Sequence, residues 1–273
     1  MEAQTPIIDV RKVLREKAPR ISKKIPACIV NYLIRTIHQD ELNRILQCHA
    51  ALDGVAFMEA LIREFDLTLR LTGEEHLPSP EGRYLFVSNH PLGGLDGICL
   101  TALIGQRYGE QVRCLVNDLL LFIPNLRSIF IPINKHGAQT KEAAVRLDEV
   151  FASDCQVLTF PAGLCSRKQN GHITEWKKSF VRNAVKYHRD VVPVFFEGRN
   201  SDFFYRLAHI RKRLGIKLNI EMLYLPDEMF RNKHKTFHVY IGKPISWKTF
   251  DGGRKPAKWA EWVKQKVYQL SEK

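Results

Sequence analysis

The chain has 273 residues, 45% of them hydrophobic, and a net charge of +13 at pH 7. This length and composition suit one large α/β domain with an added helical segment. The six cysteines form no Cys-x-x-Cys pair, which argues against a zinc site, and no apolar stretch approaches the ~20 residues that a membrane-spanning helix requires. The positive surplus favours an anionic partner: nucleic acid, an anionic membrane face or an acidic carrier protein.

Residues up to about 65 are predicted to be helical. Pro26 suits the first turn of a helix, and further helices are expected over 41–50 and 52–65. The helix that begins near Pro26 carries apolar residues at helical spacing, namely Ile29, Leu33, Ile34 and Ile37. We therefore expect an N-terminal helical segment over 1–66. The first ten residues lack a basic patch before an apolar core, so no signal peptide is expected.

From residue 67 onward, strand-like and helix-like stretches alternate. The expected strands are 67–71, 84–87, 112–115, 128–131, 156–159, 191–195 and 236–241. The expected helices are 97–104, 141–152, 179–187, 203–214 and 257–270. This alternation predicts an α/β fold over 67–273, with a sheet covered by helices on both faces.

The most informative stretch follows the expected strand over 84–87. It presents His90, then a Gly93-Gly94 bend, then Asp96 at the start of a helix. The ends of strands are where α/β sheets place their sites. A histidine there can take a proton near neutral pH, and a nearby carboxylate can hold its tautomer and stabilise its charged form. On spacing alone, an ordinary loop histidine with an N-capping aspartate is the somewhat favoured alternative.

Three later blocks add to this motif: 128–135, 160–167 and 191–196. In this order and at these separations, the four blocks resemble the PlsC-like glycerolipid acyltransferase superfamily. The pattern of that family is Asn-His-x4-Asp, a Phe-Ile-x-Arg block, Phe-Pro-Glu-Gly-Thr-Arg-Ser, and a Val-Pro-Val strand. The resemblance spans roughly residues 73–245 and rests on the combination of blocks. It implies the mixed sheet covered by helices of that family.

The departures from the family pattern bear on the acceptor. The His-to-Asp gap holds five residues instead of four, and the second block has Asn134 and Lys135 in the region of the family arginine. The third block has Ala162 in place of glutamate and Cys165 in place of arginine. In members that use a phosphate-bearing acceptor, those arginines hold the phosphate. The variant blocks are similar to the hemolysin-like branch, which includes O-acyltransferases that complete ornithine or glycine aminolipids.

The resemblance implies an O-acyltransferase that moves a fatty acyl group from acyl carrier protein (acyl-ACP) or acyl-CoA to the hydroxyl of a lyso-lipid. A lyso-ornithine or lyso-glycine lipid is the first expected acceptor, and lysophosphatidate is the second. His90 is the expected general base, Asp96 the residue that orients it, and no cofactor or metal is expected. The expected substrate-binding residues are Asn89, Gly94, Asn134, Lys135, Phe160, Pro161, Gly163, Ser166 and Arg167.

The location expected for such an enzyme is cytoplasmic, peripheral on the inner face of an anionic membrane. In the resembling family, N-terminal helices rest on the membrane; a helical cap packed on the sheet is an equal alternative for residues 1–66. Two other functions remain open. A nucleic-acid-binding protein is suggested by charge, but no recognisable motif supports it and no nucleic acid is expected. A lipid hydrolase is disfavoured because no Gly-x-Ser-x-Gly elbow occurs.

Two basic features of the second half have ordinary explanations. A group of cations near the end of the 203–214 helix is expected to be a solvated face: Arg206, Arg211, Lys212, Arg213 and Lys217. The last helix carries Trp259 and Trp262 beside lysines. Tryptophans next to lysines suit an interfacial helix, but an aromatic face packed on the core is the favoured interpretation.

Overall fold

The structure is a computed structural model that describes residues 7–17, 19, 24–116, 123–132, 141–163, 165, 168–169, 172–216 and 219–272. The chain divides into two compact units. The helical unit comprises Met1–Leu52 and Asn200–Lys233, and the sheet unit comprises Asp53–Arg199 and His234–Lys273. Within the described residues, no helix combines the length and the apolar character needed to cross a bilayer.

A seven-stranded sheet forms the centre of the sheet unit, in the order β1-β9-β8-β2-β5-β3-β4. Its strands are β1 (Thr68–Thr72), β2 (Tyr84–Ser88), β3 (Val112–Val116), β4 (Phe130–Pro132), β5 (Gln156–Thr159), β8 (Asp190–Phe196) and β9 (Thr236–Ile241). Neighbouring strands are parallel except β8 and β9, which are antiparallel. The expected mixed α/β sheet is therefore confirmed.

Every strand expected from the sequence is present, with ends that differ by two residues or fewer. The largest difference is at β4, which starts at Phe130 because residues 127–129 form a turn. A two-stranded hairpin, β6 (Lys168–Gln169) and β7 (His172–Ile173), was not expected. Strands of two residues are too short to show a period in the sequence.

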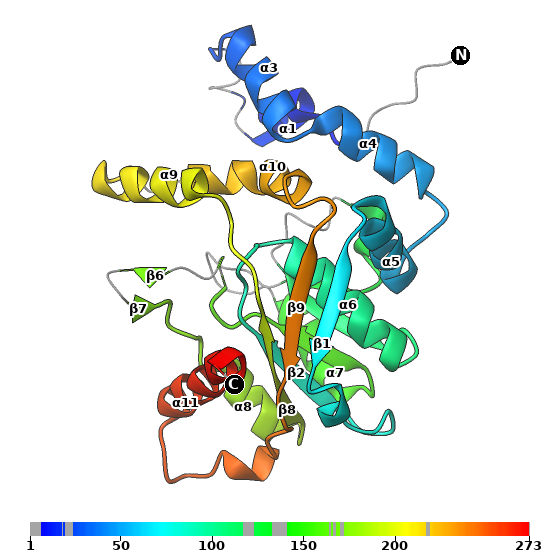
Figure 1. Ribbon diagram of the computed structural model, residues 1–273, viewed down its shortest axis with the longest axis vertical. Coiled ribbons are helices and arrows are strands. Elements are labelled where there is room, and N and C mark those ends of the chain that lie inside the picture. The colour runs from blue at the N-terminus through cyan, green and yellow to red at the C-terminus, as the bar shows by residue number, and fades with distance from the viewer. Residues whose placement is uncertain are drawn as a thin grey trace. The chain divides into compact units, whose positions relative to one another are not determined.

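Helices cover both faces of this sheet. They are α5 (Gly54–Glu64), α6 (Leu95–Arg107), α7 (Lys141–Ala152), α8 (Ser179–Lys186) and α11 (Pro256–Tyr268). Figure 1 shows α8 and α11 on one side of the strands and α5 and α6 on the other. Because side chains alternate along a strand, Leu85 and Val87 of β2 join the core cluster of α7, α8 and α11, whereas Phe86 contacts Tyr108 at the end of α6.

The last helix packs its aromatic residues inward. Trp259 belongs to the core cluster that also contains Val263 and Val267, and its ring meets Trp262 edge to face at 5.4 Å. The indole N–H of Trp259 donates to the carbonyl of Asp251. The favoured interpretation of this helix, an aromatic face on the core, is confirmed.

A buried arginine joins the starts of strands β2, β5 and β8 to the end of helix α7. Arg189, just before β8, is fully buried, and burial lowers the pKa of its guanidinium. The guanidinium donates to backbone carbonyls, those of Tyr84, Val150, Phe151, Ser153 and Cys155. The carbonyls of Val150 and Phe151 lie in the last turn of α7, so the arginine acts as a C-terminal cap for that helix.

The helical unit combines segments that lie far apart in the sequence. Its main elements are α1 (Val10–Lys17), α3 (Ala27–Thr36), α4 (Gln39–Cys48), α9 (Asp202–Arg213), the 3-10 helix η4 (Ile220–Tyr224) and α10 (Leu225–Phe230). Helix α5, at the end of the segment expected to be N-terminal and helical, packs on α6 in the sheet unit. A Cβ at Gly105 of α6 would collide with Val55 of α5, so the close approach requires glycine. The domain boundary expected after residue 66 stays a prediction.

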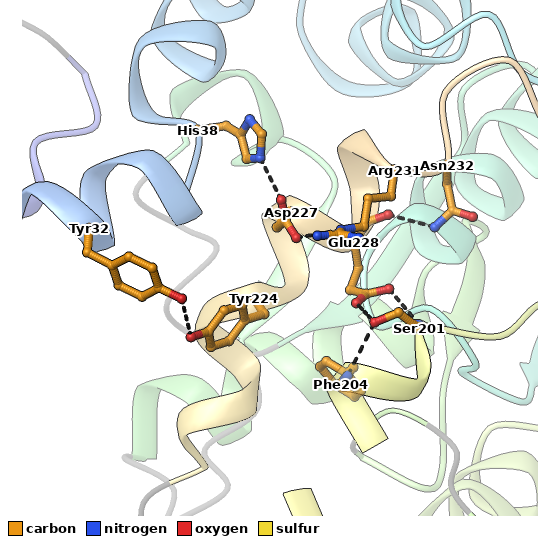
Figure 2. Close-up of polar contacts among 9 residues, drawn as sticks. All are labelled: Tyr32, His38, Ser201, Phe204, Tyr224, Asp227, Glu228, Arg231 and Asn232. Atoms are coloured by element: carbon orange, nitrogen blue, oxygen red, sulfur yellow. Dashed lines mark hydrogen bonds and ion pairs between the residues drawn. The ribbon is translucent and has the colours of Figure 1, made fainter. Parts of the chain in front are cut away.

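Polar contacts link the N-terminal helices to η4 and α10, as Figure 2 shows. The hydroxyls of Tyr32 and Tyr224 lie 2.8 Å apart. His38, between α3 and α4, places Nε2 3.0 Å from Asp227 Oδ1. Arg231 donates to the second oxygen of Asp227 at 2.7 Å. These bonds make the N-terminal helices and residues 200–233 one folded unit.

The start of α9 is fixed in the same network (Figure 2). The side chain of Ser201 caps α9 by accepting from the N–H of Phe204 at 3.2 Å. Glu228 of α10 in turn accepts from the backbone N–H of Ser201 at 2.7 Å and from its hydroxyl. Helix α9 is therefore anchored at its first turn to α10.

Candidate active site

The carboxyl ends of three parallel strands bring sequence blocks together in the sheet unit. Strand β2 lies between β5 and β8 and is parallel to both. His90 follows β2 by two residues, and Phe160 directly follows β5. Because parallel strands end at the same edge, the first and third blocks meet there, where open α/β sheets bind ligands.

His90 and Asp96 are in direct contact. His90 Nδ1 lies 3.0 Å from Asp96 Oδ2. The same carboxylate accepts the backbone N–H of Leu92 at 3.0 Å and that of Gly97 at 2.9 Å. Asp96 is 0% exposed, whereas the His90 side chain is 18% exposed. The carboxylate is thus held by three donors, and the imidazole keeps an accessible edge.

The bend between the two residues depends on glycine. Gly93 has φ of 75°, a left-handed conformation that favours glycine, and Gly94 stands at the N-cap of α6. Asp96 lies in the first turn of α6, where the positive end of the helix dipole stabilises a carboxylate. The bend therefore turns the chain back, so that a helix-terminal carboxylate reaches the ring of His90.

Phe160 supports the other side of the imidazole. Its ring stacks on that of His90 with centroids 4.1 Å apart and planes 22° apart. A tight turn presents it: Gly163 has φ of 67°, and its N–H donates to the carbonyl of Phe160 at 2.9 Å. Pro161 is buried in this turn, and its carbonyl accepts from Lys177. Phe160 was expected to line the acceptor pocket; its contact with His90 was not expected.

Asn89 has a structural partner. Its side chain is buried, accepts from the N–H of Phe196 at 2.7 Å and donates to the carbonyl of Phe196 at 2.8 Å. The amide thereby fixes the end of β2 to the end of β8, beside the loop of His90. Gly198, after the end of β8, also approaches the loop of His90 closely: a Cβ at this position would lie 3.2 Å from the side chain of Leu92. The substrate-binding role expected for Asn89 stays a prediction.

The remaining expected binding residues are placed as follows. A Cβ at Gly94 would meet open space, so this position next to the His90 loop is uncrowded. Four residues lie outside the described residues: Asn134, Lys135, Ser166 and Arg167. Cys165, which stands where the family has arginine, is buried. Its thiol is therefore not at the protein surface.

The arrangement can perform general base chemistry. If the ring of His90 donates its Nδ1 proton to Asp96, the neutral tautomer carries its lone pair on Nε2. A proton taken up at Nε2 gives an imidazolium whose charge the buried carboxylate stabilises. The sequence suggested both residues. It did not suggest the two backbone N–H groups that hold Asp96, or the ring stacking, which depends on β2 and β5 being neighbours in the sheet.

Comparisons with known proteins place the chain among acyltransferases. Residues 12–273 match the family model described as Acyltransferase. A lyso-glycine lipid O-acyltransferase of Bacteroides thetaiotaomicron is 53% identical over 266 residues, 97% of each chain. One of Phocaeicola vulgatus is 52% identical over 266 residues, 97% of this chain and 95% of that protein. The crystal structure of the 1-acyl-sn-glycerophosphate (LPA) acyltransferase PlsC of Thermotoga maritima is a more distant relative, with 16% sequence identity. The match covers 89% of this chain and 93% of that one, with a TM-score of 0.47.

Proposed function

Because the chain belongs to the Acyltransferase family, we propose that it transfers a fatty acyl group from an acyl thioester to the hydroxyl of a lyso-glycine lipid. The activity named for two relatives, at 53% and 52% identity over nearly the whole chain, supports this acceptor. They favour the aminolipid acceptor over lysophosphatidate, in agreement with the missing family arginines. Within the aminolipids, they favour glycine lipid over ornithine lipid.

The contact between His90 and Asp96 carries the mechanism. His90 Nε2 removes the proton of the acceptor hydroxyl as the oxygen attacks the thioester carbonyl. The tetrahedral intermediate then collapses, the C–S bond breaks, and His90 returns the proton to the departing thiolate. Asp96 keeps the ring in the required tautomer and stabilises the imidazolium between these two steps.

The oxyanion of the intermediate needs hydrogen-bond donors. Of the backbone N–H groups near the start of α6, those of Leu92 and Gly97 already donate to Asp96. The N–H groups between them, from Gly93 to Leu95, are the proposed donors. The open space at Gly94 supports an approach of the reacting carbonyl from this side.

The acceptor head group is proposed to contact the third block and the residues after β4. Ser166 and Arg167 are assigned to the head group, together with Asn134 and Lys135. An acyl amino acid presents a carboxylate or an amide instead of a phosphate. Single cations can pair with such groups, whereas the bidentate arginine fork that suits phosphate is missing at Cys165.

A direct assay tests the acceptor. Purified protein is incubated with acyl-ACP or with acyl-CoA, and with lyso-glycine lipid, lyso-ornithine lipid or lysophosphatidate at equal ionic strength. Products are identified by mass spectrometry. We expect the highest kcat/KM on lyso-glycine lipid, whichever thioester proves to be the donor.

Three results would contradict the proposal. A higher kcat/KM on lysophosphatidate that collapses in Arg167→Ala would show a displaced phosphate site. Release of free fatty acid without an acylated lipid would show a hydrolase. A salt-dependent gel shift at nanomolar protein, without acyl transfer, would favour the nucleic-acid-binding alternative.

The enzyme is proposed to work as a peripheral protein on the inner, cytoplasmic face of an anionic membrane. The net charge of +13 supports attraction to that surface. Such attachment should weaken with salt. Membrane fractions are washed with high salt and with alkaline carbonate; release supports the proposal, whereas extraction by detergent alone would favour inserted apolar helices.

A further inference from the structure

Exposed apolar side chains concentrate in one of the two units. Among the described residues, all the large hydrophobic side chains that are strongly exposed, except Val145, belong to the helical unit. They are Ile7, Val13, Ile29, Tyr32, Phe203, Ile210, Leu214, Ile216 and Leu223. Single exposed apolar residues are ordinary, but a concentration in one unit marks an interaction surface.

Helix α9 orders several of these residues into a stripe. Phe203, Leu207, Ile210 and Leu214 are spaced by four, three and four residues, so they lie along one line of the helix. Phe203 is 50% exposed, Ile210 53% and Leu214 68%, and Leu207 is partly exposed. We call these four residues the α9 stripe. The buried line of α9, with Phe204 and Ala208, points elsewhere, so the stripe does not form the core of the unit.

Apart from Asp202 in its first turn, the charged residues of α9 are all basic. Between Phe203 and Ile216 the chain contains no aspartate or glutamate. Arg206 and Arg213 are exposed and lie on one flank of the stripe by helical spacing. Arg211 does not belong to this surface, because it is buried and paired with Glu221 of η4 at 2.8 Å. The solvated basic face expected at the end of this helix is therefore smaller than predicted, and Lys217 lies outside the described residues.

The stripe is held rigidly enough to act as a surface. Ser201 caps the first turn of α9, and Glu228 holds Ser201. At the far end, the Arg211 guanidinium pairs with Glu221 and donates to the carbonyl of Ile216 at 2.8 Å. Both ends of the helix are thus tied within the helical unit. The apolar line can insert into a partner without first paying the entropy of ordering the helix.

We infer that the α9 stripe is an interfacial surface of this protein that inserts into an anionic lipid bilayer. An apolar line flanked by arginines, with Asp202 as the single acidic residue of the helix, matches acyl chains beside anionic head groups. A helix of this kind lies in the plane of the interface and does not cross it. The inference deepens and rests on the proposed function, because it names the element, remote in sequence from the N-terminal helices, that carries the enzyme to its lipid acceptor.

Vesicle binding tests the inference without any need for catalysis. The protein is floated with vesicles of phosphatidylcholine alone or mixed with phosphatidylglycerol, and the partition coefficient is measured. Ile210→Ser combined with Leu214→Ser should lower the coefficient for the mixed vesicles by about tenfold or more, since two large side chains lose their burial. Val145→Ser is the matched control: Val145 of α7 is 55% exposed, and its change should leave binding unaltered.

A second variant separates charge from burial. Arg206→Gln combined with Arg213→Gln should weaken binding to the mixed vesicles and reduce its salt dependence, with little effect on phosphatidylcholine vesicles. Circular dichroism checks that each variant is folded. Unchanged binding of a folded Ile210→Ser, Leu214→Ser protein would overturn the inference. So would light scattering that shows a wild-type dimer dissociated by this change, since the stripe would then bind a second copy.

A further assay distinguishes failure of the inference about the α9 stripe from failure of the proposed acyl transfer. Lyso-glycine lipid offered below its critical micelle concentration should be acylated equally by wild type and by the stripe variant. Loss of transfer in both proteins would contradict the proposed activity and leave the vesicle result intact. Wild-type transfer with unchanged vesicle binding of the variant would contradict the stripe alone.

Discussion

Two of the histidine–aspartate pairs in the described residues, one in each unit, combine nearly the same contact with a stacked aromatic ring. His90 Nδ1 lies 3.0 Å from Asp96 Oδ2 in the sheet unit, and His38 Nε2 lies 3.0 Å from Asp227 Oδ1 in the helical unit. Both imidazoles also stack on a phenylalanine, His90 on Phe160 and His38 on Phe230. The distance between the ring centroids is 4.1 Å for His90 and 4.3 Å for His38.

The surroundings of the two pairs differ. Asp96 is fully buried and accepts two backbone N–H groups, whereas Asp227 is 23% exposed and is shared with Arg231. The second nitrogen of His38 lies 3.8 Å from Glu41, so both ring nitrogens face carboxylates and the ring bridges helices. A histidine–aspartate contact is therefore no evidence of catalysis by itself. The proposed base is distinguished by its position at the carboxyl edge of the sheet and by the contact of Nδ1, not Nε2, with the aspartate.

The largest difference between the pairs should appear on removal of each histidine. His90→Ala should lower kcat by at least about a thousandfold, because a general base contributes ~10²–10⁴ and its orientation is lost as well. His38→Ala should retain the kcat of wild type on an acceptor lipid that is offered below its critical micelle concentration. Acyl transfer is measured by mass spectrometry and folding by circular dichroism. Near-normal turnover by a folded His90→Ala protein would contradict the proposed mechanism.

The next largest difference in kcat should be between variants of the two aspartates. Asp96→Asn should lower kcat by ~10²–10⁴, by analogy with the orienting carboxylate of serine proteases. The amide no longer stabilises the imidazolium and can favour the wrong tautomer. Asp227→Asn should leave kcat at neutral pH within a few-fold of wild type. If both changes reduced kcat equally while both proteins stayed folded, the distinction between the pairs would be wrong.

The stacked rings should give a smaller contrast. Phe160→Ala should lower kcat by about three- to tenfold, because an aromatic pair contributes roughly 0.5–1.5 kcal/mol and here holds the base. Phe230→Ala should reduce the thermal stability of the helical unit without lowering kcat on a dispersed acceptor. Steady-state kinetics and thermal melts check both. A loss confined to KM in Phe160→Ala would assign that ring to substrate binding instead.

The smallest effect concerns acid stability. Burial acts to raise the pKa of the Asp227 carboxyl, but hydrogen bonds from His38 and Arg231 outweigh it and hold the pKa below its ordinary value. A carboxyl with a depressed pKa stabilises the fold above its unfolded pKa, and this contribution is lost as pH falls through the folded pKa. Wild type should therefore lose stability below about pH 4, and Asp227→Asn should lose less over that range. Melting temperatures from about pH 6 to pH 3 test this, and parallel curves for the two proteins would contradict it.

Local patterns in the sequence were sufficient for the elements and for the order of the site blocks. The strands β2 and β8 contain continuous apolar runs and β5 is buried along its whole length, as expected for strands buried on both faces of a parallel region. The position of His90 after β2 and of Phe160 after β5 follows from these runs alone. The resemblance to acyltransferases, carried by the same blocks, agrees with the family match.

Only the tertiary structure decided which of these residues meet. The return of Asp96 to the imidazole depends on the left-handed Gly93 and on the start of α6, and the stacking of Phe160 depends on β2 and β5 being neighbours. The amide of Asn89 is occupied by the end of β8, which no local pattern indicates. Residues 200–233 likewise join the N-terminal helices through contacts nearly 200 positions apart, such as Tyr32 with Tyr224. Periodicity and turn preferences act over a few residues, whereas these contacts depend on strand order and packing, which the whole chain determines.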